Sequence, residues 1–229
     1  MVSFNTALKL DPKSASAYGN RGYIYLQENR LDLAAADFDQ ALQIDAKEIT
    51  GLEGKAAIAQ RNDDPTRAVA LLTHVLELYP DDDWARVRRA ESFTELHQYD
   101  EALKEMNLLL SKTPADPVWL NDRCWYRAIA GKELAIALAD CDASLKIKEI
   151  PASRDSRGLV NLRSGKFDDA VADYDKALSE KPNQPSSLYG RGIAKIRKGA
   201  SADGNADITA GLAIDPKVEK TFAGYGVTP

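Results

Sequence analysis

Small and apolar residues recur along the chain with a fixed period of 34 residues. One series steps by this period and contains small side chains throughout: Gly22, Ala56, Ala90, Cys124, Gly158 and Gly192. A second series is all leucine and carries a single-residue insertion in the fourth unit: Leu42, Leu76, Leu110, Leu145, Leu178 and Leu212. A period of about 20 to 50 residues is typical of stacked repeats rather than of one continuous core. The pattern predicts six units, at 15–48, 49–82, 83–116, 117–150, 151–184 and 185–218.

Each unit contains two stretches of helical spacing separated by a turn. Most residue types at the fifteenth position tolerate the left-handed conformation that closes a helix: Asn29, Asp63, His97, Gly131, Gly165 and Gly199. Helix-starting acids follow at Asp32, Asp100 and Asp168, and Asp64-Pro65 combines a cap with a first-turn proline. Prolines then end the second stretch at Pro12, Pro80, Pro114, Pro182 and Pro216. Each unit is therefore predicted to be a helical hairpin, and the chain to be all-α.

The spacing within the units resembles the tetratricopeptide repeat. The residues that carry the resemblance are Tyr18, Gly22, Tyr25, Ala34, Phe38 and Ala41, and again Gly158, Phe167, Ala170, Tyr174, Ala177 and Pro182. The resemblance implies a right-handed α-α superhelix, or solenoid, whose first helices line a concave groove that typically binds peptides or partner proteins. The chain departs from the family pattern at the closing proline (Ala46, Glu149) and at a usually aromatic position (Ala59, Arg127, Asn161, Lys195).

The two ends differ from the repeats. Residues 1–14 match only the second helix of a unit, so we expect a truncated repeat, a chain that is a fragment of a longer protein, and an added or internal start at Met1. Residues 219–229 are expected to form a C-terminal cap, because Val218, Phe222 and Tyr225 share one helical face. We expect this C-terminus to be the natural one.

A cation occupies the seventh position of every unit: Arg21, Lys55, Arg89, Arg123, Arg157 and Arg191. Acids follow 16 residues later at Asp37, Glu105, Asp173 and Asp207, and 17 residues later, across the insertion, at Asp140. The two positions are equidistant from the hairpin turn, so we interpret the cations as partners in structural ion pairs rather than as a nucleic-acid site. Leu71 stands opposite Lys55, which should be more solvated or should pair with an acid of a neighbouring unit.

Composition excludes several functional classes. The chain has 229 residues, 44% of them hydrophobic and 28% charged, and a net charge of −5, which disfavours nucleic-acid binding. No apolar stretch is long enough to insert into a membrane, and no signal peptide is visible. We predict no metal site, no cofactor and no enzymatic activity, because two cysteines, two histidines and no catalytic motif are present. A cytoplasmic location is the default, and a periplasmic one follows if the chain is a fragment of an exported protein.

The two cysteines are placed on facing positions. Cys124 takes the small position of the fourth first helix, and Cys141 takes the aromatic position of the second helix. A disulfide is conceivable, but buried free cysteine commonly packs as a small apolar residue, and we favour that interpretation.

The resemblance also predicts which residues point into the groove. They are mixed and aromatic in character: Asn20, Tyr23, Gln27, Glu53, Arg61, Trp84, Arg88, Glu91, Asn121, Trp125, Asp155, Leu159, Arg163, Tyr189, Ile193 and Arg197. Trp, Tyr and Arg often anchor interfaces. The family's carboxylate clamp for chaperone tails is not expected, because Gly19 and Tyr23 replace its lysine and asparagine.

The leading hypothesis is a non-enzymatic interaction scaffold that binds a peptide or partner protein in the groove. The alternative is a docking or regulatory arm of a larger bacterial enzyme, including an envelope protein with a transglutaminase-like domain. Self-association through the N-terminal half repeat is a third hypothesis.

Overall fold

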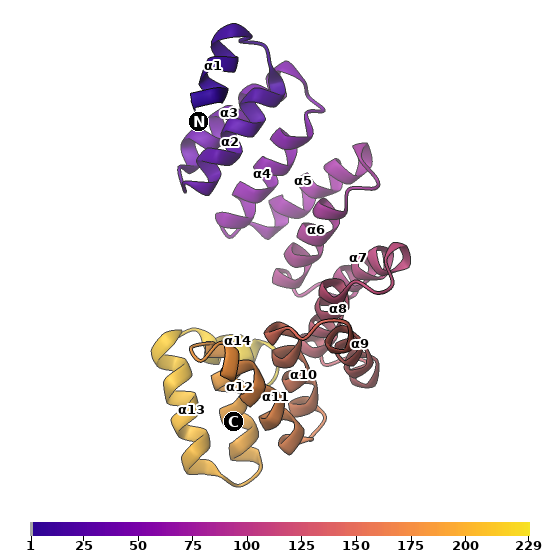
Figure 1. The fold of residues 1–229 in the computed structure, drawn as a ribbon, viewed down its shortest axis with the longest axis vertical. Helices are drawn as coiled ribbons and strands as arrows, with labels where there is room; N and C mark the ends of the chain where they lie inside the picture. Colours follow the sequence, from indigo (N-terminus) through magenta and orange to yellow (C-terminus); the bar gives the residue numbers. More distant parts are fainter. Residues whose placement is uncertain (1) are drawn as a thin grey trace. The chain divides into compact units, whose positions relative to one another are not determined.

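A computed structural model describes residues 2–229, with side chains from Phe4 onward, so the interpretation of Met1 lies outside the described residues. Within this range the chain forms fourteen helices and no strand (Figure 1). The helices are α1 (Val2–Leu10), α2 (Ala15–Gln27), α3 (Leu31–Ile44), α4 (Ile49–Arg61), α5 (Pro65–Leu78), α6 (Asp83–Glu95), α7 (Tyr99–Lys112), α8 (Pro117–Ala130), α9 (Leu134–Ile147), α10 (Pro151–Arg163), α11 (Phe167–Glu180), α12 (Pro185–Arg197), α13 (Ser201–Ile214) and α14 (Val218–Gly224).

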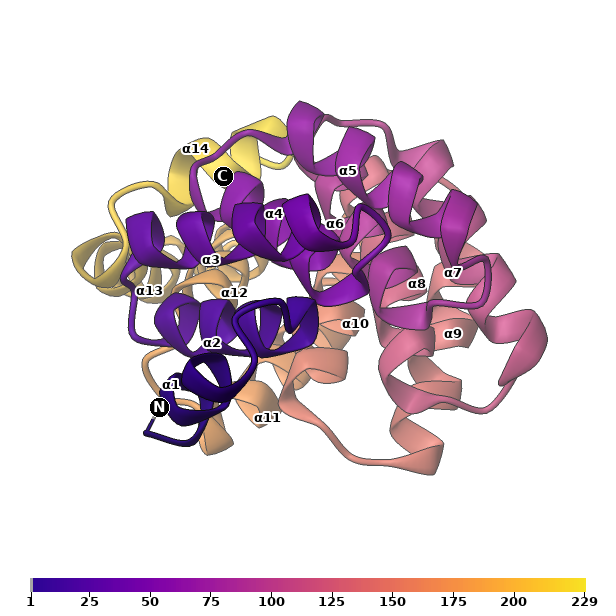
Figure 2. The same cartoon turned by 90° about the horizontal axis from the view of Figure 1, so that it is seen from above.

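The chain divides into two compact units, residues 1–105 and 106–229, which we call unit 1 and unit 2. The boundary falls inside α7. In unit 1, helices consecutive in the sequence pack together from α1 to α6, and α2 also contacts α4. In unit 2 the same holds from α8 to α14, and the first helices α8, α10 and α12 additionally pack in a row (Figure 2).

The turns lie where the sequence predicts them. All six residues at the fifteenth position have a positive φ, between 57° at His97 and 100° at Gly199. Glu133 is also left-handed, with φ 48°, so the extra residue of the fourth hairpin is absorbed in its turn. The predicted prolines each follow the end of a helix, and the carboxylate of Asp64 accepts a hydrogen bond from the Arg67 amide at the start of α5.

The two helices of a hairpin approach closely because their facing residues are small. A Cβ atom at Gly192 in α12 would lie 2.7 Å from the carbonyl oxygen of Gly204 in α13, and a Cβ at Gly204 would lie 2.6 Å from the Gly192 carbonyl. Phe38 in α3 fills the equivalent space in unit 1 against Gly22 and Gly54 and is fully buried. The recurrent small residues are therefore a requirement of helix packing.

The predicted ion pairs of the seventh position are present and confirm the structural interpretation. Arg157 donates from Nε and Nη2 to the two carboxylate oxygens of Asp173, at 2.9 and 2.6 Å. The same two-bond geometry joins three further pairs: Arg21–Asp37, Arg123–Asp140 and Arg191–Asp207. Arg89 also pairs with Glu105 of its own hairpin. Lys55 pairs with Asp39 of the preceding hairpin, which confirms that it takes an acid from a neighbouring unit.

Each arginine also donates backward to the preceding hairpin, a contact that the sequence analysis missed. Arg157 Nη1 lies 2.6 Å from Asp142 Oδ1, and Arg191 Nη1 lies 2.6 Å from Asp175 Oδ1. Neutral acceptors serve the other three arginines: Asn5 for Arg21, Thr73 for Arg89 and Asn107 for Arg123. One guanidinium therefore ties its own first helix to the second helices on both sides.

The polar residues that stand where the family usually has an aromatic residue belong to the same network. Arg127 donates to Asp140 at 2.5 Å, Asn161 donates to Asp173 at 3.0 Å, and Lys195 pairs with Asp207 at 2.8 Å. Where the position is aromatic, the ring instead lies against the arginine of the seventh position, as Tyr25 does with Arg21 and Phe93 with Arg89. Polar residues at this position thus replace a cation–π contact by a hydrogen bond to the shared carboxylate.

We expect Arg157→Ala to lower the free energy of unfolding by about 2 kcal/mol, between the values typical of exposed and of fully buried pairs. Asp173 is only 4% exposed, but it keeps hydrogen bonds from Arg154 and Asn161, which limits the loss. Urea unfolding monitored by circular dichroism measures the change. Arg67→Ala, an exposed arginine on α5, is the control. Equal stability of the two variants would contradict a structural role for the network.

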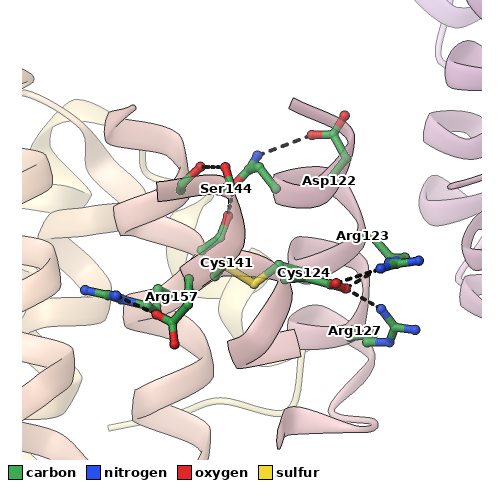
Figure 3. The surroundings of a disulfide bond; sticks show 12 residues. Asp122, Arg123, Cys124, Arg127, Cys141, Ser144 and Arg157 are labelled. Atoms are coloured by element: carbon green, nitrogen blue, oxygen red, sulfur yellow. Dashed lines mark hydrogen bonds and ion pairs between the residues drawn. A yellow bond between two sulfur atoms is a disulfide. The ribbon is translucent and has the colours of Figure 1, made fainter. Parts of the chain in front are cut away.

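Cys124 and Cys141 form a disulfide between α8 and α9, so the interpretation as free cysteines is wrong (Figure 3). Their Cα atoms are 5.6 Å apart, within the range that a disulfide spans. The close approach of the two helices, with cysteine at the small position, produces this separation. Sequence spacing places both residues on the seam but does not define the distance between them.

We expect reduction of this bridge to lower the free energy of unfolding by about 3 kcal/mol, because it closes a loop over 17 residues and restricts the unfolded chain. Urea unfolding with and without dithiothreitol measures the effect, and a Cys124→Ala/Cys141→Ala variant should show no response to the reductant. Mass spectrometry after alkylation without reduction tests the bridge directly: incorporation of two alkyl groups into the folded, unreduced chain would contradict it.

Candidate functional site

Unit 1 brings most of its predicted groove residues together. A depression of about 370 Å3 lies over α2, α4 and α6. Six of the predicted residues line it: Tyr23, Gln27, Arg61, Trp84, Arg88 and Glu91. Glu53 adjoins it through Tyr23, whose hydroxyl lies 3.5 Å from the Glu53 carboxylate. Asn20 lies outside this lining, exposed on α2, and donates to the Ser16 carbonyl at 2.8 Å.

The charged side chains of this depression are held by specific contacts. The Arg88 guanidinium lies over the Trp84 ring, 5.5 Å from its centroid, and donates to Glu91 at 2.9 Å. Arg61 donates to the Leu26 carbonyl at the end of α2, at 2.6 Å, so it connects α4 to α2. Gln60 connects α4 to α6 by donating to the Arg88 carbonyl at 3.1 Å. Arg61, Gln60 and Arg88 therefore have defined partners that connect the three helices at this surface.

Glu53 lies in an acidic environment within this surface. Burial, followed by a hydrogen bond and charge repulsion from Asp82, raises the pKa of Glu53 to about 8. The Asp82 carboxylate is already used as the cap of α6, where it accepts from the Ala85 amide at 2.9 Å. Burial and the Glu53 charge also raise the pKa of Tyr23. The protonated Glu53 carboxyl is thus the form that the folded chain favours near neutral pH.

We expect Glu53→Gln to change the pH dependence of stability. The folded chain keeps the Glu53 proton to about pH 8, whereas the unfolded chain releases it above about pH 4.3. Wild-type stability therefore falls as pH rises through this window. The glutamine side chain does not ionise. The free energy of unfolding of the variant, relative to that of the wild type, should therefore be unchanged at pH 4, increase with pH, and level off above pH 8.

Urea unfolding midpoints at pH 4, 6 and 9 measure this effect. Glu180→Gln, an exposed position on α11, is the matched control and should follow the wild type. Parallel pH profiles of the wild type and Glu53→Gln would contradict the elevated pKa.

In unit 2 the predicted groove is not open. Leu159 and Tyr189 are each 1% exposed, Ile193 is 0% exposed and Asn121 is 8% exposed. The expectation that these four side chains point into an open groove is therefore wrong. The remaining predicted residues of this unit are partly or fully exposed: Trp125, Asp155, Arg163 and Arg197.

Two packing contacts account for part of this burial. Asn121 lies against α10, where its side-chain carbonyl accepts a hydrogen bond from the Ser156 hydroxyl at 2.9 Å, and the C-terminal segment, residues 218–229, covers Tyr189 and neighbouring parts of the first helices of unit 2. The Phe222 ring packs on Tyr189 with centroids 5.1 Å apart, and the Tyr225 ring meets Trp125 edge-on at 5.8 Å. Arg163 donates to the Tyr225 carbonyl, and Arg197 donates to the Thr228 carbonyl at 2.7 Å.

The contacts of this segment extend beyond those of an end cap. The shared face of Val218, Phe222 and Tyr225 predicts burial, and Val218 and Phe222 are indeed buried. That face gives no sign of a contact with α8, about 100 residues earlier in the chain. A cavity of about 380 Å3 remains beside the segment, bounded by residues of α8, α10, α12 and α14.

Paired antiparallel helices with left-handed turns, each stacked on its neighbours, define a helical-hairpin repeat protein. Two family models, both described as tetratricopeptide repeat, match residues 3–49 and 156–217, and residues 59–121, together about three quarters of the chain. The chain belongs to the tetratricopeptide repeat family.

Solved structures share the fold at low sequence identity. A tetratricopeptide repeat protein from Parabacteroides merdae is 19% identical over 92% of this chain and 87% of its own, with a TM-score of 0.74. PilW, a type IV pilus biogenesis factor, is 20% identical over 80% of this chain and 87% of its own, with a TM-score of 0.65. These likenesses confirm the prediction of an all-α fold of stacked helical hairpins.

A third structure, the Cut9–Hcn1 hetero-tetramer of the APC/C, matches with a TM-score of 0.78 and 15% identity over 97% of this chain. The chain spans 44% of the length of that matched chain. No curated protein is significantly similar to the chain. Across residues 2–229, none of the helices combines the length and apolar character needed to cross a bilayer.

Proposed function

We propose that the chain is a non-enzymatic interaction scaffold and that it binds a peptide segment of a partner protein on the α2–α4–α6 surface of unit 1. The observation that carries the proposal is the Trp84–Arg88 stack, which lies in a depression that none of the described residues of unit 1 fills. Tryptophan, tyrosine and arginine are the side chains that most often dominate binding energy. Arg61 and Arg88 already make contacts with the chain, which reduces the side-chain entropy that they lose on binding.

The lining suggests what kind of peptide would fit. Arg61 and Arg88 stand beside Glu91 and Glu95, so the surface presents both charges and favours a polar peptide of mixed charge. The exposed amide of Gln27 can hydrogen-bond to a peptide backbone. Apolar side chains of the peptide would pack on Tyr23 and Trp84. Unit 1 is preferred over unit 2 as the peptide site because the C-terminal segment covers the equivalent helices of unit 2.

We expect a random peptide library displayed on phage to yield binders to the purified full chain. Trp84→Ala and Arg88→Ala should each lower the affinity for the selected peptides at least about tenfold, as is typical of interface anchors. Calorimetry on synthetic peptides measures the affinities. Trp84→Phe should retain part of the affinity, and Arg67→Ala, on the outer helix α5, should retain all of it. Selected peptides that bind both alanine variants with wild-type affinity would place the site elsewhere and refute the proposal.

The disulfide supports an oxidising compartment, such as the periplasm of a bacterium, over the cytosolic default. Persistent structural disulfides are rare in reducing compartments. Alkylation and mass spectrometry of the protein taken directly from its source cells, with the lysis carried out in the alkylating agent, tests this location. The purified protein, alkylated in the same way, shows whether the bridge survives the procedure. If it does, recovery of the doubly alkylated chain from the source cells would argue for a reducing compartment.

A further inference from the structure

Asp155 is a partly buried carboxylate without the arginine partner that the buried acids of the second helices have. Five buried acids on the second helices of their hairpins each pair with an arginine: Asp37, Glu105, Asp140, Asp173 and Asp207. Asp155 on α10 instead accepts hydrogen bonds from the hydroxyls of Ser186, at 3.2 Å, and Ser187 on α12. Among the described residues no cation pairs with it. Burial raises the pKa of Asp155, although the two serines oppose the shift.

Asp155 lines the cavity of about 380 Å3 described above. Three aromatic side chains contribute to the same lining, Trp125 from α8 and Phe222 and Tyr225 from the C-terminal segment. Asp122 and Asp215 also line it, whereas Lys181 is the single basic residue in the lining. The cavity therefore combines aromatic rings with an excess of negative charge.

This combination favours a cationic guest. A carboxylate has about four acceptor sites, and two hydroxyl donors leave Asp155 with capacity for an ammonium group. A charged donor strengthens such a hydrogen bond, and it offsets the cost of holding a carboxylate away from water without a counter-charge. Aromatic faces attract cations and also pack against methylene groups. An anionic guest would meet three carboxylates and one ammonium and is disfavoured.

A lysine side chain has the required shape. Its four methylene groups can pack on the rings of Trp125 and Tyr225 while its ammonium group reaches the carboxylate. The cavity lies within the volume range of ordinary ligand pockets, about 300 to 1,000 Å3, so it accommodates one such side chain with its neighbouring backbone. Since Phe222 and Tyr225 form part of the wall, the site exists only while the C-terminal segment is in place.

We propose that this cavity in unit 2 binds the side chain of a lysine in a partner polypeptide, with the ammonium group on Asp155 and the methylene groups against Trp125 and Tyr225. The site is separate from the peptide surface of unit 1 and does not depend on it.

The test is a titration of the full chain, labelled with nitrogen-15, observed through the indole signal of Trp125. The probe is Nα-acetyl-lysine N-methylamide, and its neutral control is Nα-acetyl-norleucine N-methylamide, which has the same carbon skeleton without the ammonium group. We expect the lysine probe to shift the Trp125 signal in a saturable manner and the norleucine probe to bind at least about tenfold more weakly, the factor expected for a lost charged hydrogen bond. This comparison uses the wild-type chain and needs no variant.

Asp155→Asn keeps the side-chain shape and should reduce the affinity for the lysine probe at least about tenfold. Asp203→Asn, at an exposed position on α13, should bind it as the wild type does. n-Butylamine serves as a third probe, since a free amine could be the natural guest. Tighter binding of the free amine than of the lysine probe would overturn the assignment to a polypeptide.

Equal affinities for the lysine and norleucine probes, absence of a Trp125 response, or an Asp155→Asn variant with wild-type affinity would each overturn the proposal. None of these outcomes affects the unit 1 surface, which is tested separately through Trp84 and Arg88.

Discussion

The cation at the seventh position of each repeat holds the hairpins together. Four of the five arginines here donate two hydrogen bonds to the carboxylate of their own second helix and a third to the second helix of the preceding hairpin, as Arg157 does with Asp173 and Asp142. Arg89 donates only one hydrogen bond to Glu105. The planar guanidinium group can bind one carboxylate through two nitrogens and still donate to a second acceptor, a geometry that the lysine ammonium group does not provide. Lys55 faces Leu71 instead of an acid in its own hairpin and makes a single ion pair, to Asp39 of the preceding one. The network requires the backbones to approach closely, so the small residues of the hairpin seam and the arginines depend on one another.

The two units use equivalent inner helices differently. In unit 1 the Trp84–Arg88 stack and Tyr23 line an accessible depression, whereas in unit 2 Tyr189 and Trp125 are engaged by Phe222 and Tyr225 of the same chain. The C-terminal segment contributes Phe222 and Tyr225 to the wall of the unit 2 cavity, whose volume of about 380 Å3 is similar to the 370 Å3 of the unit 1 depression. We propose that the unit 1 depression is a peptide surface and the unit 2 cavity a side-chain pocket within one chain.

Acidic groups divide into two populations with different environments. Those between the helices of a hairpin, such as Asp173, are neutralised by arginine and stabilise the stack. Two partly buried acids on the inner helices, Glu53 and Asp155, have no arginine partner among the described residues: burial raises the pKa of each, and each lies beside hydroxyl-bearing or aromatic side chains. Buried acids without a cation are costly for stability, and Asp155 lines, while Glu53 adjoins, a surface that we propose for binding.

The sequence alone determined the repeat period, the turn positions, the helix ends and the arginine–acid pairs. These features arise from contacts within one hairpin, whose partners stand at a constant separation in every unit. Even Arg127, Asn161 and Lys195, which looked like departures, donate to the acid that the period already indicated. The tertiary structure alone decided the disulfide, the burial of Leu159 and Tyr189, and the placement of the C-terminal segment over α8. Helical periodicity defines which face a residue occupies, but distances across a seam and contacts between segments far apart in the chain depend on how the helices finally pack.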